Sequence, residues 1–147
     1  MILTRDEDIV ALCGRLQRVA VLGIKTEAQA GQPAYSVAQY LQAAGVMIVP
    51  VPAYYPEVTT ILGEPVYRTV SAIPGHVDCV DVFRRPQDID AHVEDIVAKK
   101  PSAVWFQLGI RNNAAAQRLS DAGMTVVQDR CLKIDFARFR AQQRPGT

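Results

Sequence analysis

The sequence has few of the residues that build metal sites and cross-linked frameworks. Only three cysteines, Cys13, Cys79 and Cys131, occur among its 147 residues. They are widely spaced and odd in number, which is typical of reduced thiols and argues against a disulfide framework or a zinc knuckle. We therefore expect no metal site.

Excess charge and long apolar runs are also absent. Sixteen Lys and Arg residues offset fifteen Asp and Glu residues, so the net charge of +1 gives no overall field to hold nucleic acid or an anionic membrane. No apolar stretch approaches the roughly eighteen residues that span a bilayer. Residues 1–8 have neither the basic start nor the apolar run of a secretory signal. We expect a cytoplasmic protein that binds neither membrane nor nucleic acid, and any anion site must be local.

What is present is the composition of a globular protein, with 49% hydrophobic and 21% charged residues. The length predicts a single domain over residues 1–147. Five short runs rich in Val and Ile, bounded by Gly or Pro and nearly continuous in hydrophobicity, are typical of buried parallel strands. They are residues 18–24, 46–51, 77–83, 102–108 and 124–128.

The segments between these runs have helical periodicity and helix-stop signals. The predicted helices are residues 6–16, 33–44, 86–99, 112–122 and 131–142. Residues 54–73 are irregular and interrupted by proline, and we expect only a helical turn or two there. Alternating strands and helices predict one doubly wound α/β domain, in which ligands bind at the carboxyl ends of the strands, near the point where strand order reverses.

The loop after the first strand is the first candidate for binding an anion. Gly23 permits close approach to the backbone, Lys25 adds a cation, and the helix from Pro33 offers free N–H groups. A pyrophosphate could bind there, although the spacing is not G-x-G-x-x-G. A tight strand-to-helix turn without a ligand is the alternative.

The second strand argues against a nicotinamide dinucleotide. An acidic residue should follow that strand to accept the ribose hydroxyls, and the sequence there is Val51, Pro52, Ala53, Tyr54, Tyr55. The two tyrosines either flank an adenine or pack within a proline-rich loop.

The third strand ends in the best local anion signal, the pair Arg84 and Arg85. Planar guanidinium groups donate two hydrogen bonds to one phosphate. The alternatives are a solvated pair or a partner for Asp81, which is unusual in an apolar strand and is expected to orient arginine or backbone groups.

The last two strand ends offer no complete catalytic group. Trp105 is expected in the core, while Gly109 lets a ligand lie against bare backbone. Cys131 begins a helix next to Arg130, which favours thiolate and makes it a candidate redox thiol, a structural thiol being the alternative. A nucleophile would need a base, and both histidines are predicted away from the ligand edge, His92 on a helix exterior. We assign no catalytic residue.

Taken together, these loops resemble one known family. The segments that carry the resemblance are VAVLGI (19–24), YSVAQYL (35–41), ILGE (61–64), VDVFRRP (80–86), WFQLGI (105–110) and DRCLKI (129–134). In this order they are similar to the small stand-alone CoA-binding proteins, which are related to the CoA-binding domain of succinyl-CoA synthetase alpha subunits.

The resemblance implies a Rossmann-like three-layer αβα sandwich with a five-stranded parallel sheet of order 3-2-1-4-5, and coenzyme A across the strand carboxyl ends. The residues that it places on CoA, together with the charged Arg85, are Gly23, Ile24, Lys25, Thr26, Ala53, Tyr54, Phe83, Arg84, Gln107, Leu108 and Gly109.

This chain departs from the family pattern at three positions. Members usually have Arg-Pro-Ser-Tyr before the first long helix, whereas Gln32 and Ala34 stand here in place of a cation and a hydroxyl. Pro52 stands where Asn is usual. The synthetase's second domain, which carries the phosphorylated histidine, is absent, so no ligase activity is expected of this polypeptide alone.

The sequence thus favours a CoA or acyl-CoA binding protein without catalytic activity, acting as a carrier or sensor. Two alternatives remain, a small NAD(P)-binding oxidoreductase and a subunit that completes a larger acyl-CoA ligase.

Overall fold

The computed structural model describes residues 1–143 and confirms the predicted α/β class. Its centre is a parallel sheet whose strands are nearly all buried, which is why their sequences are apolar without alternation. The sheet strands are β1 (Arg18–Leu22), β2 (Met47–Val51), β5 (Cys79–Val82), β6 (Ala103–Phe106) and β7 (Thr125–Val127).

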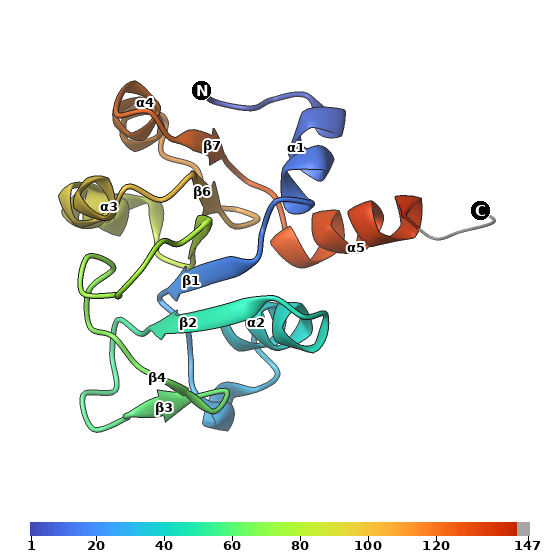
Figure 1. Ribbon diagram of the computed structural model, residues 1–147. Coiled ribbons are helices and arrows are strands. Elements are labelled where there is room, and N and C mark those ends of the chain that lie inside the picture. Colours follow the sequence, from blue (N-terminus) through green and yellow to red (C-terminus); the bar gives the residue numbers. More distant parts are fainter. Residues whose placement is uncertain (144–147) are drawn as a thin grey trace.

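Helices cover both faces of the sheet and complete the three-layer sandwich (Figure 1). One face packs against α1 (Asp6–Cys13), α2 (Pro33–Ala43) and α5 (Leu132–Gln142). The other face packs against η2 (Pro86–His92), α3 (Val93–Lys99) and α4 (Asn113–Asp121). These helices lie where periodicity predicted them, except that α1 ends earlier and the first half of 86–99 is a 3-10 helix.

The predicted strand order 3-2-1-4-5 is wrong. The sheet runs β2-β1-β5-β6-β7, which is 2-1-3-4-5 when only the sheet strands are counted. Val21 lies opposite Pro50 on one side and Asp81 on the other. The reason is Pro50, which has no N–H for a ladder and therefore belongs in an edge strand. Its carbonyl accepts from Tyr67 N at 3.0 Å.

The helical turns predicted within residues 54–73 are also wrong. The segment contains a small hairpin of β3 (Thr60–Ile61) and β4 (Glu64–Pro65). Leu62 and Gly63 between them have φ values of +54° and +74°, the left-handed pair that a two-residue hairpin turn requires. Proline at 56 and 65 removes donors that a helix would need. The hairpin lies next to β2 at the edge of the sheet (Figure 1).

The core contains one polar anomaly. Trp105 is buried as predicted, and its Nε1 donates to the carbonyl of Arg130 at 2.8 Å. Asp81, in the adjacent strand, is also fully buried, and neither carboxyl oxygen has a hydrogen-bond partner within the described chain. We had expected Asp81 to orient arginine or backbone groups, and this prediction is wrong. Burial raises the pKa of Asp81 well above its usual range, because desolvation favours the neutral acid over the carboxylate.

Candidate functional site

A hollow of about 210 Å³ lies at the carboxyl ends of β1, β2 and β5. The strand order reverses between β1 and β5, because the chain continues to one side after β1 and to the other after β5. This is the place where open α/β sheets bind ligands. The hollow is lined by Gly23, Ile24, Lys25, Ala34, Ala53, Tyr54, Tyr55, Phe83, Arg84 and Arg85.

Gly23 allows the loops after β1 and β5 to cross closely. Its φ is +87°, and a Cβ there would stand 2.3 Å from the carbonyl oxygen of Phe83. Only glycine fits a left-handed backbone that is also this close to another chain segment. The two loops therefore form a continuous wall of backbone.

The loop after β1 and the start of α2 present donors to the hollow. Lys25 N donates to Ala34 O at 3.0 Å, which ties the loop to the first turn of the helix. The N–H groups of Ile24 and Ala34 have no acceptor within residues 1–143. Lys25 forms no ion pair with any described residue. An uncompensated ammonium beside free amides and a helix N-terminus favours an anion.

The two arginines at the end of β5 are less free than their sequence indicates. The Arg84 side chain is only 18% exposed and lies 3.7 Å from Asp88, while Arg85 donates to the same carboxylate at 2.8 Å. Hydrogen bonding from Arg85 lowers the pKa of Asp88, so this carboxylate stays ionised. The guanidinium of Arg84 also lies 5.7 Å from the ring centre of Tyr54. Together, the two arginines and the Asp88 carboxylate thus carry one net positive charge beside the hollow.

His92 lies at this site and not on the helix exterior where we had predicted it. Arg84 Nε donates to His92 Nε2 at 3.2 Å, so the ring accepts and is neutral. Burial, and after it the charge of Arg84, lowers the pKa of His92. The contact spans a 3-10 helix, a shape that periodicity does not predict.

A second, open hollow of about 600 Å³ adjoins the first and shares the wall of Ala53, Tyr54 and Tyr55. Tyr54 is 61% exposed and its ring stands edge-on to Tyr55. The remaining lining includes Pro52, Pro56 and Arg68. Arg68 and His92 are the surrounding residues that sequence reasoning missed, and proximity in the fold is what reveals them.

The other predicted ligand residues do not line the hollow. Thr26 caps the 3-10 helix η1 (Glu27–Gln29). Gln107 accepts from Leu132 N at 3.0 Å, and Gly109 N donates to Asp129 at 2.7 Å. Leu108 is 66% exposed in the loop after β6. The corrected strand order explains the separation of residues 107–109, because β5 stands between β1 and β6.

Cys131 is half-buried immediately before α5, whereas Cys13 and Cys79 are buried. The neighbouring Arg130 is occupied by Asp135 and Asp6, at 2.8 and 2.7 Å. Burial raises the pKa of Cys13 to about 12 and that of Cys79 well above its usual value. Cys131 is thus the accessible thiol of the described chain.

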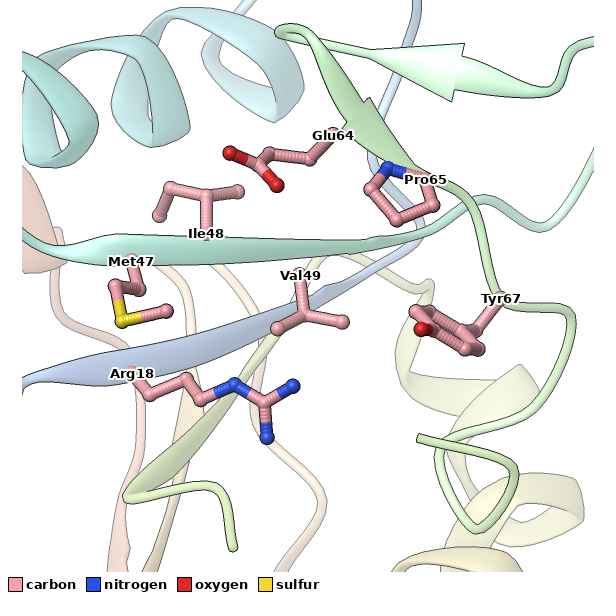
Figure 2. A pocket seen from close by; sticks show the side chains of 7 residues that line it. All are labelled: Arg18, Met47, Ile48, Val49, Glu64, Pro65 and Tyr67. Carbon is pink, nitrogen blue, oxygen red and sulfur yellow. The ribbon is translucent and has the colours of Figure 1, made fainter. Parts of the chain in front are cut away.

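A separate hollow of about 80 Å³ lies against β2 and the hairpin, away from these loops (Figure 2). Arg18, Glu64 and Tyr67 are among the side chains that surround it. Since one water occupies about 30 Å³ of liquid, this space is too small for a nucleotide. Within residues 1–143 no helix has the length and apolarity to cross a membrane, and no group of His, Cys, Asp and Glu side chains is arranged to hold a metal ion.

Comparison with known families assigns the chain to one of them. The model of a family described as CoA binding domain matches residues 17–137. The chain belongs to this CoA binding domain family. A relative in Bacillus subtilis (strain 168), the uncharacterized protein YneT, is 30% identical over 130 residues, covering 88% of this chain and 93% of that protein.

Solved structures with a similar fold were also found. The structure of cell-free ID.343 from Thermus thermophilus has a TM-score of 0.82 at 31% identity and covers 92% of this chain and 99% of that one. Acetyl-coenzyme A synthetase 1 of Ca. Korarchaeum cryptofilum matches 75% of this chain but only 25% of its own, with 17% identity and a TM-score of 0.62. At that identity it shows the fold alone.

Proposed function

We propose that this protein binds coenzyme A or an acyl-CoA, with the pyrophosphate in the 210 Å³ hollow. The observation that carries the proposal is the uncompensated Lys25 beside the free amides of Ile24 and Ala34, at the point where strand order reverses. Each charge-assisted hydrogen bond there contributes about 1.5 to 3 kcal/mol. Membership of the CoA binding domain family supports this choice of anion.

The two hollows differ in size, and each suits a different part of the ligand. The first hollow is smaller than the roughly 300 to 1,000 Å³ of a site for a whole drug-sized ligand, so it suits a phosphate segment. The adjoining open hollow offers apolar walls from Pro52 and Tyr54 for the base. The exposed Leu108, in the loop after β6, offers an apolar surface for the pantetheine arm.

A carrier or sensor role fits the side chains at the site. His92, the histidine that borders it, is bonded to Arg84 and does not face the hollow as a free base. The end of β2 has no acidic residue for ribose hydroxyls, which disfavours an NAD(P)-dependent oxidoreductase.

Titration calorimetry with CoA, dephospho-CoA and NAD tests the function. We expect saturable binding of CoA and no measurable binding of NAD. Binding of NAD without binding of CoA would contradict the proposal.

The resemblance of the sequence to the CoA-binding domain of succinyl-CoA synthetase alpha subunits leaves a second candidate, a subunit that completes a larger acyl-CoA enzyme. A pull-down with a ligase-type partner distinguishes it. Stable association that adds ligase activity would favour the subunit, and its absence leaves the carrier or sensor.

A further inference from the structure

The Arg68 side chain forms an unusual cluster of hydrogen bonds near the site. Its guanidinium donates to the backbone carbonyls of Tyr54, Tyr55, Pro56 and Val58, at 3.2, 3.0, 3.2 and 2.6 Å. One planar fork thereby holds the whole loop 54–58. Lysine could not reproduce this arrangement, because its ammonium is a single point with three donors.

The segment that carries Arg68 is itself fixed to the fold. Tyr67 N donates to the carbonyl of Pro50 in β2 at 3.0 Å. On the other side, Val70 N and Ser71 N donate to the carboxylate of Asp95 in α3 at 2.7 and 3.0 Å. Arg68 thus extends from an anchored segment to a loop with few other backbone contacts.

The loop that Arg68 holds forms the wall between the two hollows. Tyr55 has φ of +63°, a left-handed conformation that disfavours a large side chain. The loop has one internal backbone hydrogen bond, from Val58 N to Tyr55 O at 3.1 Å. A strained loop of this kind needs external contacts to keep one conformation before a ligand arrives.

We infer that Arg68 is a positioning residue, which preorganises the loop 54–58 so that Tyr54 and Tyr55 stand in place for the nucleotide. This rests on the proposed binding of CoA. Arg68 acts through the backbone of the loop, and it lowers the ordering cost that would otherwise be subtracted from the affinity. Its contribution therefore comes from the geometry of the guanidinium, not from its charge alone.

The test compares Arg68→Met and Arg68→Lys with the wild-type chain, and Arg140→Met on the exposed part of α5 as a control for loss of one positive charge. We expect CoA affinity by calorimetry to fall about tenfold in both Arg68 variants and to remain unchanged in the control. Chymotrypsin should cleave after Tyr54 faster in both variants, and saturating CoA should restore protection. Unfolding by urea shows whether the variants remain folded.

Two results would overturn the inference while the proposed function stands. One is wild-type affinity in both Arg68 variants. The other is wild-type affinity in Arg68→Lys alone, which would show that charge and not loop geometry matters. If the wild-type chain does not bind CoA, the proposed function fails and this inference fails with it, whatever the proteolysis shows.

Discussion

Among the three cations predicted to bind phosphate, the structure distinguishes Lys25 from the arginines. Arg84 and Arg85 share Asp88, whereas Lys25 has no carboxylate partner within residues 1–143. A cation without a competing partner can give its full interaction to a ligand.

Lys25→Met should therefore weaken CoA binding by about 1 to 3 kcal/mol, since it removes one charge-assisted contact and keeps the stem of the side chain. Calorimetry measures the change, and Arg15→Met on the surface after α1 serves as the charge control. Equal affinity of Lys25→Met and wild type would remove Lys25 from the site.

Asp81 makes stability depend on pH in a defined direction. Because its folded pKa is raised, the native state keeps a proton that the unfolded chain releases above about pH 4. Its contribution is therefore present at low pH and is lost as pH rises, by about 1.4 kcal/mol per pH unit until the folded pKa is reached.

Asp81→Asn should remove this slope, because an amide does not titrate. In urea denaturation at a series of pH values, the unfolding free energy of the variant relative to wild type should rise with pH above about pH 4, until the folded pKa of Asp81 is reached. Parallel curves for the two proteins would show that Asp81 does not retain its proton on folding.

The three thiols should differ in reactivity. Cys13 and Cys79 are buried with raised pKa values, and Cys131 is half-buried. A native thiol titration should modify one cysteine, located at Cys131 by peptide mass spectrometry, and denaturation should expose the other two. Modification of Cys13 or Cys79 in the folded chain would contradict this. If Cys131 faces the pantetheine end, its thiol should exchange with CoA disulfide, releasing one CoA thiol and forming a mixed disulfide that adds the mass of CoA less two hydrogens.

At the level of elements, two of the departures from the family pattern, Gln32 and Ala34, lie at the start of α2, next to the proposed site. Gln32 is the residue before the helix and forms no side-chain capping bond, while Ala34 lines the hollow. Of the two positions usually held by Arg and Ser, the Ser position therefore lines the hollow proposed for the pyrophosphate, and the Arg position lies two residues before it.

Ala34→Ser should restore a hydroxyl donor and strengthen CoA binding by about 0.5 to 1.5 kcal/mol, and Gln32→Arg should strengthen it further. Calorimetry compares them with Ala43→Ser at the far end of α2 as a control. Unchanged or weaker binding in both site variants would place the phosphates elsewhere.

The elements also show how much of the fold follows from sequence. Buried strands and capped helices were predicted because apolar runs and stop signals are local. The strand order was predicted wrongly, because strand pairing is non-local, although Pro50 marks β2 as an edge strand. Leu62 and Gly63 similarly mark a hairpin turn that proline-based reasoning missed.

For the whole molecule, the sheet topology decides which predicted residues meet. Gly23, Lys25, Tyr54 and Arg84 come together because β1 lies between β2 and β5. Residues 107–109 follow β6, which is separated from β1 by β5. Arg68 and His92 belong to no motif, and their positions next to the site are known only from their contacts with Tyr54 and Arg84.

The most direct test of the account is an amide NMR titration of the ¹⁵N-labelled chain with CoA. Binding at the β1–β5 reversal predicts saturable shifts at residues 23–25, 34, 53–55 and 83–85. Absence of saturable shifts would contradict the account. So would shifts confined to the groove between α3 and α4, or to the small hollow beside β2.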